Sequence, residues 1–397
     1  MSPVAMRGRR SEGQPKGTKE AKVAKGTRAT QRPPGHRSLR FLVLLVVGLL
    51  LCLLGVVMVL SASSVNDLRA HGDAWYHLKR QVIWLLIGLA GLMVMIRIDY
   101  RRLRPLAVPG LFGCMALLML VLVPGVGLSA NGSTRWLDLG VVSLQPSELA
   151  KMALVLYCAD LLSRRERPLT DKKLTLYPVV GMVGLIGVLL MLEPDLGTTM
   201  IMGAIAVAML FFAGLQLRLL ALLVGGGALG AFGLTMSAGY RRQRLLGMLD
   251  PWTDPLNTGW QAIQSGVAIS NGGLFGVGLG ASRSKWGFLP FAHTDFIYAI
   301  IAEEFGLIGA GLVLVGFLVI GLVGLSTALH APDPFGQLLA AGITTWIMIQ
   351  AFVNIGAVLG RLPITGVPLP FVSFGGTALI VTLGAFGILL NIARQTP

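Results

Sequence analysis

Charged and polar side chains occur at four places within or beside long apolar runs of this 397-residue sequence. If these runs cross a bilayer, an ionisable group near its centre costs at least ~2.5–3.5 kcal/mol, so it needs a partner or a task. We therefore take these places as the candidate chemistry of the protein. They are residues 145–151, 193–199, 292–304 and 361–377.

The first two places each combine two ionisable side chains with a proline. Glu148 and Lys151 are three residues apart on one helix face, which predicts an ion pair, and Ser147 can cap that helix. The pair could merely fix the helix in a bundle, or it could line a cavity. Glu193 and Asp195 flank a proline directly before another apolar run. A polar helix start would explain Asp195, whereas two carboxylates at a bilayer edge suit a cation or a polar ligand.

The other two places lie in the last third of the sequence. His293 and Asp295 precede a long apolar run, in which Glu303 and Glu304 follow about two helical turns further on. Asp295 has two interpretations, an ordinary helix cap or a catalytic carboxylate. Residues 361–377 are rich in proline and glycine, which predicts broken backbone that lines a cavity or is buried in protein. A cavity open to the outer face is expected there.

The composition excludes an ordinary soluble enzyme and indicates a membrane protein. Hydrophobic residues make up 54% of the chain and charged residues 13%, against roughly 25% charged in a typical soluble domain. Residues 1–40 hold 11 basic and 2 acidic residues, which is +9 of the total net charge of +15. This distribution disfavours a nucleic-acid partner, which needs a basic folded face, and predicts a disordered basic tail beside anionic lipid.

Ten apolar runs are candidates for membrane-spanning helices. The first would rise about 33 Å as a helix, enough to cross the ~30 Å hydrocarbon layer. The predicted fold is therefore an all-α polytopic membrane protein, with a tail at residues 1–40 and a ten-helix domain at residues 41–397. The runs are residues 41–62, 81–98, 103–123, 147–162, 174–192, 197–214, 217–237, 300–328, 336–359 and 371–392.

Basic residues predict the orientation of these spans. Clusters of arginine and lysine follow the second and fourth spans, on the side of the basic tail. By the positive-inside rule, both termini are expected in the cytoplasm. The connection between helices 7 and 8, residues 238–294, is then extracytoplasmic. Its 57 residues are too many for a passive link, so a functional role is expected for it.

Several other kinds of site are excluded by their missing motifs. The sequence has no Walker loop, HExxH or GxSxG, its five histidines are scattered, and its three cysteines lack paired spacing. The glycine run at residues 272–280 has no βαβ context, so we expect it to allow close backbone packing rather than to bind a dinucleotide. Glycines inside the spans, such as Gly226 and Gly230, predict close helix contacts.

The motifs at these places resemble those of the SEDS family of bacterial cell-wall polymerases, the FtsW and RodA proteins. The resemblance covers nearly the whole chain after the tail. The residues near 131, the serines after the first span and the basic N-terminus resemble the FtsW division branch more than the RodA elongation branch. Phe291 and Phe374 stand where the family commonly has an acidic residue and a tyrosine. The matching blocks are residues 61–64, 131–136, 145–151, 193–199, 259–265, 293–295 and 368–370.

The resemblance implies a peptidoglycan glycosyltransferase that polymerises lipid II, a disaccharide-peptide carried on undecaprenyl pyrophosphate. The transfer needs a base for the attacking sugar hydroxyl, and Asp295 is the best candidate. The cations available for the departing pyrophosphate are Arg135, Lys151, Lys285 and Arg361. Further candidates for substrate binding are polar residues of the matching blocks and of the segment 361–377, namely Glu148, Gln261, Gln264, Ser265, His293 and Ser373.

The resemblance also implies partners and a location. A class B penicillin-binding transpeptidase and other division proteins are expected as partners, in the bacterial inner membrane at the division septum. A divalent cation, Mg²⁺ or Mn²⁺, is a further candidate component with Glu193 and Asp195 as its ligands, and no organic cofactor is expected. Two alternatives stay open, a lipid II flippase and a division scaffold without polymerase activity, although the sequence has no clear inverted repeat typical of transporters.

Overall fold

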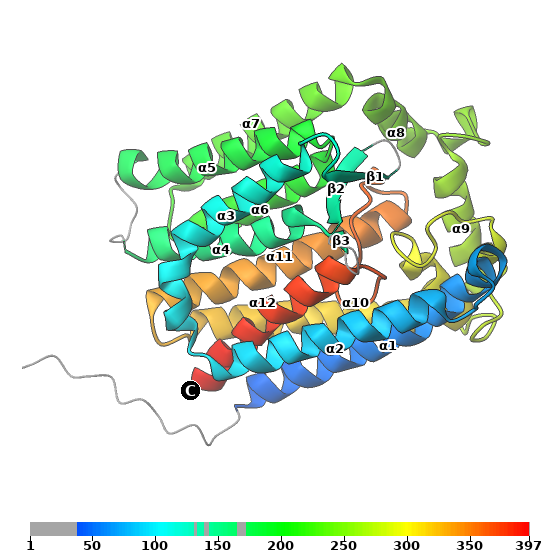
Figure 1. Ribbon diagram of the computed structural model, residues 1–397, viewed down its shortest axis with the longest axis horizontal. Coiled ribbons are helices and arrows are strands. Elements are labelled where there is room, and N and C mark those ends of the chain that lie inside the picture. The colour runs from blue at the N-terminus through cyan, green and yellow to red at the C-terminus, as the bar shows by residue number, and fades with distance from the viewer. Residues whose placement is uncertain (1–37, 131–132, 139–142, 165–171, 397) are drawn as a thin grey trace, which may run out of the picture. The chain divides into compact units, whose positions relative to one another are not determined.

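The computed structural model describes residues 38–130, 133–138, 143–164 and 172–396. Most of the predicted tail, and parts of the loops near 131, 141 and 168, lie outside these residues. Long helices dominate the described part and run roughly parallel to one another (Figure 1). The helices are α1 (Leu39–His71), α2 (Tyr76–Arg97), η1 (Tyr100–Leu106), α3 (Ala107–Val121), α4 (Pro146–Ser163), α5 (Lys172–Leu192), α6 (Leu196–Phe212), α7 (Leu217–Ser237), α8 (Gly239–Leu249), η2 (Pro251–Thr253), α9 (Trp260–Gly272), η3 (Ser284–Trp286), α10 (Ile297–Leu329), α11 (Pro334–Val358) and α12 (Gly376–Gln395).

Each of the ten predicted spans overlaps one of these helices, although the last span was predicted to begin at Phe371 and α12 begins only at Gly376. In the described residues, 8 helical segments are long and apolar enough to cross a membrane. The other two candidates fall short for simple reasons: α6 has 17 residues, and α4 contains Glu148, Lys151 and Asp160. The polytopic helical fold is therefore confirmed, and the exact number of crossings stays a prediction.

Helix starts follow the capping chemistry of the sequence at several points. Ser38 accepts a hydrogen bond from the backbone of α1, and Asp333 accepts one from the backbone of α11. Asp195 does the same for α6, so the interpretation of Asp195 as a polar helix start is confirmed. The expected cap at Ser147 is wrong, because α4 begins after Gln145 and the Ser147 hydroxyl is buried without a partner.

The centre of the bundle is formed by α11 and α12. In their most apolar stretches, 72% and 83% of residues are buried, compared with 6% in α7. Because α7 is so little buried, the predicted close contacts at Gly226 and Gly230 are wrong. A Cβ added at either position would meet nothing within 4 Å. These two glycines of α7 therefore do not mark close helix contacts within the chain.

The first and last helices meet at one end of the bundle. The Ser38 hydroxyl donates to the carbonyl of Ala393 at 2.6 Å. In the last turn of α4, the carboxylate of Asp160 pairs with Arg104 and Arg164, at 2.6 and 2.8 Å. The basic residues that predicted orientation thus form ion pairs where helices end.

The opposite end of the bundle carries the predicted long connection and a small sheet, at the right in Figure 1. The connection folds into α8, η2, α9 and η3 rather than running as a simple loop. The sheet is antiparallel in the order β1 (Gly127–Ala130), β2 (Ser133–Asp138) and β3 (Ser143–Leu144). These strands are too short for their alternation to stand out, so the sequence did not predict them.

The glycine run packs against a break in α10. Gly306 has a φ of 67° and interrupts the helix, and the amides of Val277 and Gly278 bond the carbonyls of Glu303 and Glu304 at 3.0 and 3.1 Å. A Cβ on Gly306 would lie 2.4 Å from the backbone nitrogen of residue 276. The predicted role of the glycine run, close approach of backbones, is confirmed.

Candidate active site

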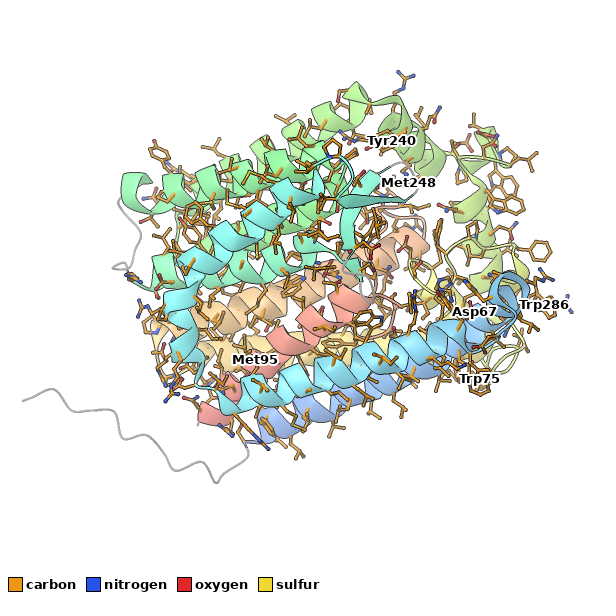
Figure 2. The ribbon with its side chains drawn as sticks, viewed as in Figure 1. Asp67, Trp75, Met95, Tyr240, Met248 and Trp286 are labelled. Carbon is orange, nitrogen blue, oxygen red and sulfur yellow. The ribbon has the colours of Figure 1, made fainter. Side chains whose placement is uncertain are left out.

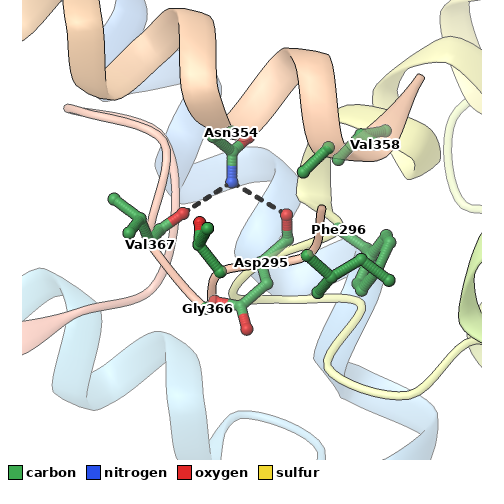
Figure 3. A pocket seen from close by; sticks show the side chains of 9 residues that line it. Asp295, Phe296, Asn354, Val358, Gly366 and Val367 are labelled. Atoms are coloured by element: carbon green, nitrogen blue, oxygen red, sulfur yellow. Dashed lines mark hydrogen bonds between the residues drawn. The ribbon is translucent and has the colours of Figure 1, made fainter. Parts of the chain in front are cut away.

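Asp295 lies in the turn between the long connection and α10, where it lines a small pocket (Figure 3). The other walls come from the start of α10, the end of α11 and residues 364–367. The cavity volume is about 10 Å³, room for about one water molecule. A Cβ on Gly366 would lie 3.6 Å from Asp295 Oδ2, so the loop backbone approaches the carboxylate closely.

The interpretation of Asp295 as a helix cap is wrong. The residue before the first turn of α10 is Phe296, and no side chain accepts a hydrogen bond there. Instead, the backbone around Asp295 is fixed from outside. Asn354 on α11 donates to the carbonyls of Asp295 and Val367 at 2.9 and 2.8 Å (Figure 3). The Asp295 side chain is therefore left for another task.

The turn is also held by Ser373, one of the predicted substrate-binding residues. Its hydroxyl donates to the carbonyl of Thr294 at 2.6 Å and accepts from the amide of Leu369 at 2.9 Å. The next amide, that of Phe374, donates to the carbonyl of His293 at 3.0 Å. Ser373 thus joins the loop before α12 to the turn that carries Asp295.

Burial and two arginines set the proton affinity of Asp295. Burial raises its pKa from 3.8 to about 6, and the positive charges of Arg244 and Arg135 act in the opposite direction. Arg244 lies on α8 and donates to the carbonyl of Ile364, one of the pocket residues, at 3.3 Å. Asp295 is therefore a carboxylate that can both accept and release a proton near neutral pH.

Arg135 extends from β2 to the turn before α6. It donates to the carbonyls of Glu193 and Pro194 at 3.3 and 2.7 Å, and its Nη1 lies 3.8 Å from Asp195 Oδ1. Both oxygens of Asp195 already accept from Thr198, at 3.1 and 2.8 Å. The sheet that the sequence did not predict is what brings Arg135 to this turn.

The predicted metal ligands do not fit a divalent cation. Arg135 occupies the side of Asp195 that a cation would need. Both carboxylate oxygens of Glu193 are buried without partners, and burial together with the charge of Asp195 raises its pKa to about 8. Among the described residues, no group of three metal-ligating side chains comes together. We therefore derive no step through a metal at this turn.

Glu148 and Lys151 form the buried ion pair that their spacing predicted. The distance from Lys151 Nζ to Glu148 Oε1 is 2.8 Å, and both side chains are almost fully buried. The ammonium also donates to Gln350 Oε1 at 2.7 Å and lies 5.2 Å from the centre of the Trp346 ring. Neither charged residue lines the Asp295 pocket.

Lys285 is also buried and paired. Its ammonium donates to Glu304 Oε1 at 3.1 Å, to the Ser61 hydroxyl at 3.1 Å and to the carbonyl of Gly280 at 2.6 Å. These bonds use all three N–H groups of the ammonium. A pyrophosphate could bind Lys285 only by breaking this cluster, which joins η3, α1 and α10.

The remaining predicted substrate-binding residues differ in their surroundings. Ser265 on α9 donates to the carbonyl of Val358 at 2.6 Å, where α11 ends beside the pocket. Gln261 and Gln264 lie half-buried on the same helix, and Arg361 is exposed after α11. Ser265 thus supports the pocket wall, whereas Arg361 is exposed to solvent and does not line the pocket.

His293 belongs to a histidine cluster at the C-terminal end of α1. His77 pairs with Asp67, its ring centre lies 4.4 Å from that of His293, and Phe374 packs against both rings. His71 lies 6.2 Å from His77, so the expectation that the histidines are scattered is wrong for these three. Burial lowers the pKa of His293 to about 4, and its Nδ1 has no partner. Figure 2 shows Asp67 at the end of the bundle that also carries Trp286.

Sequence reasoning missed three residues around the site. Arg244 went unnoticed among the arginines of α8, and Gln350 and Asn354 went unnoticed because they are uncharged. A usable signal existed for the last two: with Trp346 they occur at every fourth residue of a mostly apolar helix. Asp67 and His71 also have this spacing, but His77, the histidine that Asp67 pairs with, lies ten residues further along the chain.

Comparison with known proteins agrees with this architecture. The family model for FtsW, RodA and SpoVE, described as cell cycle proteins, matches residues 41–397. The chain belongs to this family. Within this SEDS family, it is 46% identical over 354 residues to a probable peptidoglycan glycosyltransferase FtsW of Geobacter metallireducens, which covers 89% of this chain and 94% of that protein. It is 41% identical over 355 residues to stage V sporulation protein E of Bacillus subtilis, covering 89% of this chain and 97% of that protein. These relatives place the chain in the FtsW branch of the SEDS family.

Solved SEDS structures share its fold. A chain of a peptidoglycan synthase complex that coordinates polymerization and crosslinking superposes with a TM-score of 0.68 at 33% identity, covering 85% of this chain and 96% of that chain. The rod shape determining protein RodA of Thermus thermophilus gives a TM-score of 0.65 at 29% identity, covering 89% and 96%. The helical arrangement around Asp295 is thus that of a SEDS protein.

Proposed function

We propose that this SEDS protein is a peptidoglycan glycosyltransferase that polymerises lipid II into glycan strands during septal wall synthesis, with Asp295 as its general base. The observation that carries the assignment of the base is a half-buried carboxylate that caps no helix and lines a pocket. The names of the FtsW relatives support the reaction, because they are probable peptidoglycan glycosyltransferases.

The reaction joins two sugars with loss of a lipid pyrophosphate. The 4-hydroxyl of the acceptor sugar attacks the anomeric carbon of the donor, the bond from that carbon to the pyrophosphate oxygen breaks, and the configuration inverts in a direct displacement. The proton of the attacking hydroxyl passes to Asp295. A pKa of about 6 suits this step, because the carboxylate is mostly ionised at neutral pH yet basic enough to take the proton.

Positive charge is needed where the pyrophosphate leaves. Arg135 and Arg244 both act on Asp295 electrostatically, so their charges lie within reach of the pocket. Arg361 is exposed after α11 and can contribute from solvent. Lys151 and Lys285 are held in buried ion pairs, which favours the arginines as the groups that stabilise the departing anion.

The amphiphilic substrate fits a site at the end of a helical bundle. The sugars and pyrophosphate need water, while the polyprenyl chain needs lipid-facing helices, and Asp295 lies where the long connection returns to α10. Charge alternation in the sequence supports an extracytoplasmic position for this end and cytoplasmic termini. The related synthase complex, which coordinates polymerization and crosslinking, supports a penicillin-binding transpeptidase as partner.

The base is tested with Asp295→Asn in the full chain, purified alone and with its transpeptidase. Asparagine keeps the size of the side chain but cannot take the proton, so polymerisation of lipid II should fall by roughly 10²–10⁴ in kcat. Asp73→Asn is the matched control, because this half-buried acid after α1 pairs with Lys79 and does not line the pocket, and the variant should polymerise normally.

Near-normal polymerisation by Asp295→Asn, at equal amounts of inserted protein, would contradict the assignment. An inactive wild-type protein that still binds its transpeptidase would favour a scaffold, and one that moves lipid II across vesicles without polymerising it would favour a flippase.

A further inference from the structure

Three polar side chains follow one face of α11, the central helix that runs beside the Asp295 pocket. Trp346, Gln350 and Asn354 are spaced by four residues, and at most 2% of each is exposed. Residues four apart on a helix lie one above the next on the same face. The three therefore form a continuous polar line along one face of a mostly apolar helix.

Gln350 is the centre of this line and joins two separate parts of the chain. Its Oε1 accepts from Lys151 Nζ at 2.7 Å and from Trp346 Nε1 at 2.8 Å. Its Nε2 donates to the carbonyl of Pro368 at 3.0 Å. Because Lys151 and Trp346 only donate and a carbonyl only accepts, these contacts fix the orientation of the amide.

Asn354, one turn further on, continues the connection to the site. Its amide nitrogen donates to the carbonyls of Val367 and Asp295 at 2.8 and 2.9 Å. Gln350 and Asn354 thus hold the adjacent carbonyls of Pro368 and Val367, in the loop that packs against the Asp295 carboxylate (Figure 3). A shift at Pro368 therefore reaches the pocket through one residue of backbone.

We propose that Gln350 is a positioning residue for glycosyl transfer, which couples the buried Glu148–Lys151 pair to the loop and turn that hold Asp295. The proposal rests on the proposed function of Asp295 as the base. In it, Lys151 does not touch the reacting atoms: the lysine holds Gln350, Gln350 holds Pro368, and the loop at 366–368 sets the place of the Asp295 carboxylate.

The environment of the ion pair agrees with this use. Glu148 Oε2 and the neighbouring Ser147 hydroxyl are buried without partners, so the pair is not arranged for the most complete set of hydrogen bonds. A purely structural pair would be expected to satisfy them, because buried unpaired polar atoms are costly. The well-satisfied contacts are those that lead from Lys151 to Gln350 and on to the loop.

The test compares kcat and KM of lipid II polymerisation for Gln350→Met, in the full chain with its transpeptidase. Methionine keeps the length of the side chain but removes both hydrogen-bonding groups. Displacement of a catalytic group by about 1 Å can cost 10²-fold, so kcat should fall roughly 10- to 100-fold while KM changes less than about twofold. Thr344→Val is the matched control, because it removes a buried hydroxyl of the same helix that has no partner, and both constants should be unchanged.

Coupling is tested by combining Gln350→Met with Lys151→Met. If Lys151 acts on the turn through Gln350, the double variant should lose no more kcat than the more severe single variant. Losses that multiply would overturn the proposal. If Gln350→Met does not accumulate in the membrane, Gln350→Asn decides, because it keeps the amide but is too short to join Lys151 to Pro368, and it should lower kcat in the same way.

Asp295→Asn in the same assay separates this proposal from the proposed function. Loss of activity in Asp295→Asn together with normal kcat in both Gln350 variants would overturn the positioning role and leave the base in place. Normal activity in Asp295→Asn would instead overturn the base itself.

Discussion

Two buried lysine–glutamate pairs occur among the described residues, and their surroundings differ. Lys285 and Glu304 are saturated: the ammonium uses all three N–H groups, and the carboxylate also accepts from the Ser61 hydroxyl and the amide of Ser282. Lys151 shares one bond with its glutamate, whose second oxygen is buried without a partner. The Lys285–Glu304 pair is thus fully hydrogen-bonded, whereas Lys151 also bonds Gln350 on α11.

The difference follows from what each pair connects. Lys285 joins η3 and the end of the glycine run to α1 and α10. It lies near the break in α10 at Gly306, where the glycine run supplies backbone hydrogen bonds that the helix lacks. Lys151 reaches across to α11, at the helix that holds the Asp295 turn. The same pair of residue types therefore serves architecture in one place and, by our proposal, geometry of the reaction in the other.

The largest expected effect comes from removing one lysine. Lys285→Met or Lys151→Met leaves a buried glutamate without its counter-charge, which typically costs roughly 3–5 kcal/mol, so both single variants should lower the thermal unfolding midpoint and the yield of inserted protein. Neutral double variants separate the pairs. Lys285→Met with Glu304→Gln should recover both yield and most of the polymerisation, whereas Lys151→Met with Glu148→Gln should recover yield but stay poorly active.

This contrast fails if the two double variants behave alike at equal protein amounts. Full polymerisation by the Lys151→Met, Glu148→Gln double would show that the second pair is architectural too. If the Lys285→Met, Glu304→Gln double variant folded well but stayed inactive, Lys285 would have to be counted among the residues that bind the substrate.

Asp295 differs from both glutamates: in the described part of the chain no lysine pairs with it, and two arginines act on it electrostatically. Arg244→Gln removes one positive charge, which raises the pKa of Asp295 above its value of about 6. The base is active when ionised, so the acid limb of the kcat/KM profile should move to higher pH, and polymerisation at pH 6 should fall more than at pH 8. Initial rates between pH 5 and 9 measure the shift.

Arg242→Gln, a neighbouring exposed arginine of α8, serves as the control for Arg244. An acid limb that stays in place in Arg244→Gln would mean that the group titrating in the rate is not Asp295. Equal losses at every pH would assign Arg244 to the pyrophosphate alone.

What the sequence could predict was governed by local spacing and by hydrophobicity. The apolar runs located the helices, because crossing a bilayer demands long uncharged stretches. The three-residue spacing of Glu148 and Lys151 predicted their pair, since neighbours on one helix face meet without any tertiary information. The carboxylate of Asp295 was found through its motif, although its freedom from capping required the structure.

The missed features depend on contacts between distant segments. Arg135 reaches the turn before α6 only because a short sheet carries it there, and Asp67 meets His77 across the junction of α1 and α2. Arg244 approaches the pocket from α8, more than fifty residues before Asp295 in the sequence. No local sequence pattern predicts contacts between segments so far apart. The four-residue spacing of Trp346, Gln350 and Asn354 on α11 was visible in the sequence, but it was overlooked because these side chains carry no charge.

The smallest expected effect concerns Glu193, a third buried glutamate, which has neither a lysine nor any hydrogen-bond partner. Burial and the charge of Asp195 raise its pKa from 4.5 to about 8, and Arg135 only partly offsets them, so the folded protein keeps this proton while the unfolded chain releases it near pH 4.5. The wild-type protein should therefore lose stability relative to Glu193→Gln as the pH rises from about 5 to 8, with no further divergence above that range. Thermal unfolding midpoints of both proteins in detergent at pH 5, 6.5 and 8 measure the difference. A constant difference would show that Glu193 is ionised in the fold, and a changed Mg²⁺ or Mn²⁺ dependence of polymerisation in Glu193→Gln would show that it holds a cation after all; we expect that dependence to be unchanged.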